Sequence, residues 1–289
     1  MLFTLSPLNH GQSYGANNAR EKNTLRILTS FYPMYITALN VTKNVPWVAV
    51  TNLTPPLTGC LHDYSLTTKD MKKFTVANIF VTNGAGMESF LDSIIKQYPA
   101  VKVISLSKGI PLIKGKGDEG DNPHVWVSIS NAITQVKNLG DALQKIDPAN
   151  KIMYQNNTAE YVLQLGTLRR KMRAALKPCQ GKKIVTFHEA FPYFAQEFEL
   201  EIAAVVEREP GSQPNAREIA KTIELVKRSR IKALFAEPQY PALSAQTIAQ
   251  ETGARVYVLD PAVTGPKQPD AYLRIMEKNL AILEKALKN

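Results

Sequence analysis

Short apolar segments alternate with amphipathic ones along the chain. Eight apolar segments rich in β-branched residues have the length and composition of buried strands; they are 25–30, 45–52, 78–83, 101–105, 183–187, 202–206, 233–236 and 255–259. Between them, apolar residues recur at helical spacing in 33–41, 68–74, 87–97, 130–146, 193–198, 216–228, 244–252 and 270–287. Strands that alternate with helices predict βαβ units and mainly parallel sheets. The predicted fold class is therefore α/β.

One amphipathic segment is much longer than the others. In residues 148–176, large apolar side chains recur three, four or seven positions apart; they are Tyr154, Tyr161, Leu165, Leu168, Met172 and Leu176. At 1.5 Å per residue such a helix is about 40 Å long, enough to bridge two domains and too stiff for wide hinge motion. We therefore predict a disordered leader at 1–23, an N-terminal α/β domain at 24–146, a linker helix at 147–178 and a C-terminal α/β domain at 179–289.

Composition narrows the function classes. The 289 residues carry 35 Lys and Arg against 25 Asp and Glu, a net charge of +10. The basic residues are scattered along predicted helices without aromatic residues that could stack on bases, so we expect solvated helix faces and no nucleic-acid partner. No apolar run is long enough to span a membrane. Because residues 1–23 lack the apolar core of a signal peptide, we interpret them as a leader from which the export signal was removed.

Candidate chemistry lies in three histidines far apart in the sequence, His62, His124 and His188. Each follows a predicted strand and precedes polar or helix-starting residues. Ligands bind beyond the carboxyl ends of strands in open α/β sheets, so these positions can converge. Imidazole is the commonest protein ligand for zinc, and a closed site needs three or four donors. The sequence therefore predicts a metal site assembled by the fold.

Two alternatives remain open at this point. The cysteines, Cys60 and Cys179, match no redox or zinc motif, and their pairing is undecided. A Cys60 thiolate ligand is conceivable, although a small buried residue is favoured.

A zinc hydrolase is the other alternative. It would keep a water in the fourth metal position and use Glu237 or Glu189 as general base. Nothing in the sequence marks either glutamate as a base.

Several short motifs occur in order along nearly the whole chain after Thr24. They are Ser30-Phe31-Tyr32-Pro33, Gly59 through His62 with Tyr64, Thr67 and Asp70, Asn83-Gly84 with Glu88, Asn122-Pro123-His124-Val125-Trp126, Thr186-Phe187-His188 with Ala190, Phe191, Tyr193 and Phe194, Phe235-Ala236-Glu237-Pro238-Gln239, and Leu259-Asp260-Pro261. In these motifs the chain resembles the metal-binding solute receptors of bacterial ABC importers. In this zinc and manganese group, one long rigid helix joins two α/β domains.

The resemblance implies a ligand set. His62, His124 and His188 would bind the metal together with a carboxylate, which by position is Asp260 at the end of the last predicted strand. Glu237 is the competitor for this role or an outer partner of a ligand. Manganese members tend to carry a carboxylate where this chain has His188, and three imidazoles favour Zn²⁺ over Mn²⁺.

The resemblance also implies a biological role. We expect a monomeric receptor without enzymatic activity that captures zinc outside the cytoplasm and delivers it to an ABC permease in the membrane. It would work in the periplasm or lipid-anchored at the outer face of the cell membrane. A manganese or iron receptor, or an adhesin of the same fold, is the alternative. Asn122 and Ser128 stand where the family often has Asp, which leaves the hydrogen bonding around the ligands open.

Overall fold

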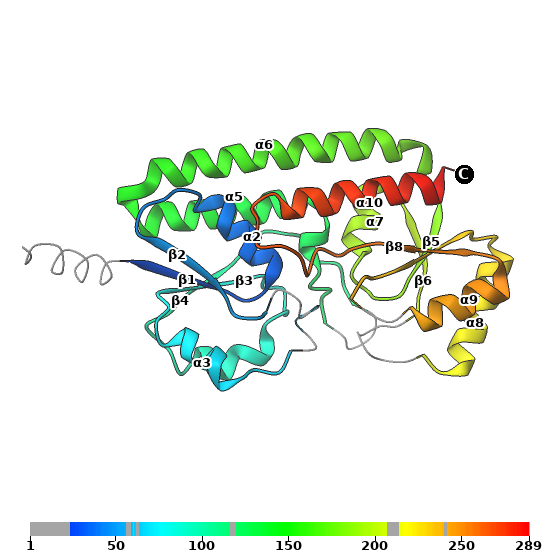
Figure 1. The fold of residues 1–289 in the computed structure, drawn as a ribbon, viewed down its shortest axis with the longest axis horizontal. Coiled ribbons are helices and arrows are strands. Elements are labelled where there is room, and N and C mark those ends of the chain that lie inside the picture. Colours follow the sequence, from blue (N-terminus) through cyan, green and yellow to red (C-terminus); the bar gives the residue numbers. More distant parts are fainter. Residues whose placement is uncertain are drawn as a thin grey trace, which may run out of the picture.

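The structure is a computed structural model that describes residues 24–55, 59, 61, 64–115, 120–206, 214–239 and 242–288. It has two lobes, each built around a four-stranded parallel sheet, beneath a layer of long helices (Figure 1). This confirms the α/β fold class that the alternating pattern predicted. The predicted leader, Cys60 and the predicted ligand His62 lie outside the described residues.

The N-terminal lobe has the strand order β2-β1-β3-β4. Its strands are β1 (Leu25–Thr29), β2 (Val48–Asn52), β3 (Ile79–Thr82) and β4 (Lys102–Ser105). Its helices are α2 (Tyr32–Val41), α3 (Thr68–Phe74) and α4 (Asp92–Ile95), the last preceded by the 3₁₀ turn η2 (Ser89–Leu91). Alternate strand residues face opposite clusters, with Ile27 and Val81 on one side and Leu28 and Phe80 on the other. Both faces are covered, as expected of a parallel sheet.

The C-terminal lobe repeats this topology with the order β6-β5-β7-β8. Its strands are β5 (Lys183–Thr186), β6 (Glu201–Val205), β7 (Ala233–Ala236) and β8 (Arg255–Val258), and its helices are α7 (Pro192–Phe198), α8 (Ala216–Arg228) and α9 (Leu243–Thr252). In both sheets the strand order reverses between the first and third strands. Such a reversal opens a crevice at the carboxyl ends of the strands, where ligands bind in folds of this kind.

A helical layer joins the lobes. Helix α6 (Lys151–Leu176) runs above both of them, with α5 (Ile129–Ile146) and α10 (Ala271–Leu287) beneath it (Figure 1). It begins after the 3₁₀ turn η4 (Pro148–Asn150) and ends in η5 (Lys177–Cys179), where the buried Cys179 carries a free thiol. The buried residues of α6 are the six predicted from spacing. One continuous apolar cluster contains side chains of both lobes, so the bridge is packed on each side.

Two predicted elements differ from the structure. Residues 87–97 form η2 and the short α4 in place of one helix. The Glu88 carboxylate turns back to accept hydrogen bonds from the amides of Asn83 and Gly84, which holds the preceding residues in turns and shortens the helix. Strand β2 starts at Val48, three residues late, because Asn44 and Trp47 have left-handed φ angles of 58° and 59°.

The C-terminal segment returns to the N-terminal lobe after β8. The Tyr32 hydroxyl donates to the Pro266 carbonyl at 2.8 Å, and Asn40 Nδ2 donates to the Pro269 carbonyl at 2.8 Å. Helix α10 then contacts α6. The residue boundaries predicted for the two domains and the linker stay a prediction.

Candidate metal centre

The segment that carries His124 is held between the two lobes. Asn122 Nδ2 donates to the Glu189 carbonyl at 2.8 Å, and the Tyr193 hydroxyl donates to the Asn122 carbonyl at 2.7 Å. On the other side, Trp126 Nε1 donates to the Pro261 carbonyl at 2.8 Å. These bonds reach residues that follow β5 and β8. The carboxyl ends of the C-terminal strands therefore face the His124 segment.

His124 and His188 meet in this region. Both are buried, with 4% and 3% of their surfaces exposed. Their ring centroids lie 4.7 Å apart, with the rings at 89° to each other. His188 follows β5 by two residues, and His124 precedes the 3₁₀ turn η3 (Val125–Val127). Two of the four predicted ligands are thus brought together from different lobes, as convergence at strand ends requires.

One ring nitrogen of each histidine has a defined partner. His188 Nδ1 lies 2.9 Å from Glu237 Oε1, and His124 Nδ1 lies 3.2 Å from Asn122 Oδ1. Asn122 Oδ1 also accepts the His124 amide at 3.0 Å, so it acts as an acceptor and the proton is assigned to His124 Nδ1. A metal bond from either ring would therefore use Nε2. This is the usual arrangement in which an outer partner orients a ligating imidazole.

Glu237 is placed as such an outer partner. It follows β7 directly and is 4% exposed. Its Oε1 contacts His188, while Oε2 is buried and has no hydrogen-bond partner among the described residues. A buried carboxylate oxygen without a donor is costly unless a cation or proton lies near it. The residues present therefore fit a cation at this end of the sheet.

Asp260 lies at the same edge, two residues after β8. Its backbone amide and carbonyl bind the side chain of Asn279 at 3.0 and 2.7 Å, and its Oδ1 accepts the Ala262 amide at 2.8 Å. Burial raises the pKa of Asp260, and the nearby charge of Glu237 raises it further. A cation bound near Asp260 would favour the charged form of its carboxyl group.

The described residues do not by themselves complete a metal site. No group of three or more His, Cys, Asp or Glu side chains in the described part of the chain is placed to hold a metal ion. The structure pairs His124 with His188 and His188 with Glu237, and it sets Asp260 at the neighbouring strand end. The ligand set that includes His62 stays a prediction.

A buried network supports the His124 segment from the N-terminal lobe. Asn83 Nδ2 donates to the Pro123 carbonyl at 2.9 Å, and Gln135 donates to Asn83 Oδ1 at 2.8 Å. Glu88 accepts the Ser30 hydroxyl and the Asn83 amide, both at 2.7 Å. Burial raises the pKa of Glu88 to about 7, although these donors favour its charged form.

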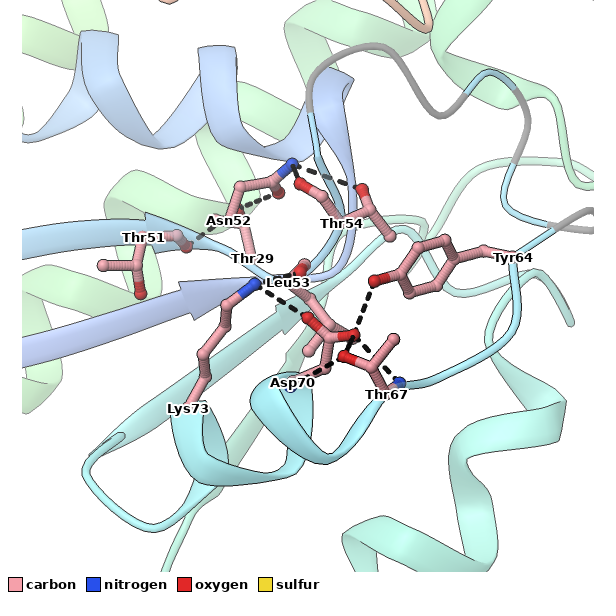
Figure 2. A network of polar contacts seen from close by, with 9 residues as sticks. All are labelled: Thr29, Thr51, Asn52, Leu53, Thr54, Tyr64, Thr67, Asp70 and Lys73. Atoms are coloured by element: carbon pink, nitrogen blue, oxygen red, sulfur yellow. Dashed lines mark hydrogen bonds and ion pairs between the residues drawn. The ribbon is translucent and has the colours of Figure 1, made fainter.

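A second polar network holds the chain on both sides of His62 (Figure 2). At the near end, Asn52 Nδ2 donates to the Thr54 carbonyl at 2.9 Å. At the far end, the Tyr64 hydroxyl donates to Asp70 at 2.5 Å. Lys73 links the two ends, because its ammonium donates both to the Leu53 carbonyl and to Asp70, the latter at 2.9 Å.

Asp70 is the centre of this network. It closes a capping box with Thr67 at the start of α3, and just before this helix the Tyr64 amide donates to the Leu61 carbonyl at 3.1 Å. Burial alone would raise the pKa of Asp70, but hydrogen bonds from Thr67, Tyr64 and Lys73 outweigh it and hold that pKa far below its usual range. Burial and the Asp70 bond raise the pKa of Tyr64 to about 12. The pair is therefore a neutral phenol bound to a carboxylate.

Replacing Tyr64 with Phe should loosen this anchor. Because Tyr64 is only partly buried, we expect a loss of about 1.5 kcal/mol of stability, the lower end for a hydrogen bond to a charged group, measured by urea unfolding. Zinc affinity should fall in parallel if His62 is a ligand. Tyr98→Phe is the matched control, since the Tyr98 ring stacks on Phe74 and its hydroxyl has no hydrogen bond to a described residue. Equal effects of the two variants would contradict the anchor.

Sequence reasoning missed several residues that shape the centre. Asn122 was noted only as a departure from a family pattern, yet it binds the ring of His124 and the Glu189 backbone of the other lobe. Nothing in the sequence singled out Glu197, because a glutamate on an amphipathic helix is usually exposed to solvent. In the structure its carboxylate accepts hydrogen bonds from Ser128 and Ser130. Its contacts depend on how the lobes meet.

A pair of buried histidines between two α/β lobes under one long helix defines a two-lobed binding protein for a small cation. The sequence profile of the family "Zinc-uptake complex component A periplasmic" matches residues 27–286. The chain belongs to this family. Its members are metal-binding transport receptors rather than enzymes, so the hydrolase alternative is set aside.

Individual relatives agree with this assignment. The high-affinity zinc uptake system protein ZnuA of Bacillus subtilis is 31% identical over 96% of this chain and 92% of that protein. The zinc-binding lipoprotein AdcA of Streptococcus pneumoniae is 29% identical over 93% of this chain, which spans only 57% of AdcA. The structure of FpvC from Pseudomonas aeruginosa in complex with Mn²⁺ has a TM-score of 0.83 and 31% identity, covering 92% of this chain and 98% of that one.

Proposed function

We propose that this protein captures a zinc ion outside the cytoplasm, between its two lobes, and delivers it to the permease of an ABC importer. The observation that carries the proposal is the pair of buried imidazoles, His124 and His188, whose ring centroids lie 4.7 Å apart at the lobe boundary. Borderline cations such as zinc prefer imidazole nitrogen, whereas manganese prefers oxygen donors. The zinc-binding relatives support the same ion.

The proposed ligands are His62, His124, His188 and Asp260, with Glu237 as the outer partner of His188. The 2.9 Å contact between Glu237 and His188 Nδ1 supports the role of Glu237. Four protein donors would close the first shell, as a capture site requires. Because α6 is packed against both lobes, release would depend on small shifts of one lobe that withdraw a ligand.

The relatives support a place of action outside the cytoplasm. The family is described as periplasmic, and AdcA as a lipoprotein, so we place the protein outside the cytoplasm, free in the periplasm or held by a lipid anchor. No helix in the described part of the chain has the length and apolar character needed to cross a membrane. We propose that the receptor acts as a monomer.

The test is a metal titration of the purified, metal-stripped protein. We expect one zinc ion per chain and clear exclusion of manganese in direct competition, measured by elemental analysis and calorimetry. Manganese is the specific alternative, because the FpvC structure holds Mn²⁺. Equal or stronger retention of manganese under matched conditions would overturn the zinc assignment.

A further inference from the structure

The side chain of Glu197 connects the two lobes close to the candidate metal centre. Glu197 lies on α7 of the C-terminal lobe, and only 3% of its side chain is exposed. Its carboxylate accepts the Ser128 hydroxyl at 2.6 Å, the Ser130 amide at 3.1 Å and the Ser130 hydroxyl at 2.5 Å. Ser128 is the N-cap of α5 and Ser130 lies in its first turn, and α5 packs against α2 of the N-terminal lobe. Short bonds from three donors to a buried carboxylate are among the stronger polar contacts in proteins.

These bonds also supply a negative charge that α5 lacks. Ser128 is the N-cap of this 18-residue helix, and its hydroxyl oxygen accepts the Asn131 amide at 3.3 Å. The first turn of α5 contains no acidic residue. A carboxylate there stabilises the unpaired amides and the positive end of the helix. In this chain that carboxylate comes from Glu197 of the other lobe.

The bridging helix takes part in the same contact. Arg169 on α6 donates to the Ser130 hydroxyl at 3.1 Å, and Arg173 lies 3.6 Å from Glu197 Oε1. Arg173 is 54% exposed, so its ion pair adds little energy. The importance of the contact lies in its position, because side chains of α5, α6 and α7 meet at the Glu197 carboxylate.

The contact lies near both histidines along the chain. Ser128 follows His124 by four residues, across η3, and Glu197 follows His188 by nine residues, across α7. Both connecting segments are packed, with Trp126 and Phe194 fully buried. A bond between residues 128 and 197 therefore fixes how the His124 segment sits against the His188 segment.

We infer that Glu197 is a positioning residue: its hydrogen bonds to Ser128 and Ser130 hold the His124 and His188 segments together across the lobe boundary and slow the release of the captured zinc ion. The inference rests on the proposed function. It adds a residue that binds no metal itself and acts through the two histidine-bearing segments.

The test compares zinc release in Glu197→Gln with the parent protein by chelator competition in a stopped-flow instrument. We expect release to become about tenfold faster, which corresponds to about 1.4 kcal/mol at 25 °C. Glu277→Gln is the matched control: Glu277 also pairs with a basic residue of α6, Lys171 at 3.1 Å, but both side chains are more than half exposed. The control should release zinc at the parent rate.

A double variant separates the lobe contact from helix capping. Ser128→Asp combined with Glu197→Ala returns a carboxylate to the N-terminus of α5 and leaves no side chain at position 197 that can bond to the other lobe. We expect its melting temperature to recover toward that of the parent while zinc release stays fast. Recovery of slow release in the double variant would overturn the inference, because capping alone would then explain it. So would an unchanged rate in Glu197→Gln.

A second readout needs no zinc. The distance between spin labels at the exposed positions Lys72 and Lys221, one in each lobe, should show a broader distribution in metal-free Glu197→Gln than in the parent. An unchanged distribution would contradict the lobe contact even where zinc binds as proposed. A broader distribution in a protein that fails to bind zinc would instead retain the contact and reject the proposed cargo.

Discussion

Replacing His188 with Ala should remove most of the zinc affinity of the protein. The loss should exceed the roughly 10–100-fold effect that is typical when only an outer partner of a ligand is removed. The reason is that a buried imidazole at the centre of the site would be replaced by water, while Glu237 would lose the ring that its carboxylate contacts. Calorimetric titration of zinc into the metal-free variant measures this loss.

The other histidines define the controls. His62→Ala and His124→Ala should cause losses of similar size, because all three are proposed ligands. His10→Ala should change nothing, since His10 lies in the predicted leader at 1–23. A strong effect of His10→Ala, or an unchanged affinity in any of the three ligand variants, would show that the metal is bound elsewhere.

The roles of the two carboxylates should separate in a matched pair of amide variants. Asp260→Asn keeps an oxygen that can accept the hydrogen bond from the Ala262 amide. It replaces a charged carboxylate, which is a strong metal ligand, by an uncharged amide, which is a weak one. We expect it to weaken zinc binding more than Glu237→Gln and to leave an exchangeable water on the metal, visible by X-ray absorption spectroscopy. Glu237→Gln should cost about 10–100-fold in affinity and keep four protein donors, as the loss of an outer partner does.

The reverse result would exchange the assignments. Full coordination in Asp260→Asn together with a missing donor in Glu237→Gln would make Glu237 the ligand and Asp260 the outer residue. An open, water-bearing site in the parent protein would contradict the proposed set of four protein donors.

Periodicity alone predicted most of the fold. A strand of four or five residues buried on both faces needs a continuous apolar run, and α6 needs one apolar face along its whole length, so both patterns are visible in the sequence. The helix predicted at 87–97 is not continuous, because a contact between a side chain and the preceding backbone outweighs the local helical preference. The Glu88 carboxylate accepts hydrogen bonds from the amides of Asn83 and Gly84, and the spacing of apolar residues does not predict such a polar contact.

By itself, the sequence determined the class of fold, the long bridge and the residue types that could bind a metal. It placed His188, Glu237 and Asp260 after strands, and strand ends of one parallel sheet must share an edge. Only the tertiary structure decided which atoms meet across the lobes. The contacts of His124 with His188 and of Glu197 with Ser128 join residues of different lobes that lie 60 to 70 positions apart in the sequence. Their geometry depends on how two independently patterned lobes pack under α6, because side-chain directions across an interface are set by packing rather than by local sequence.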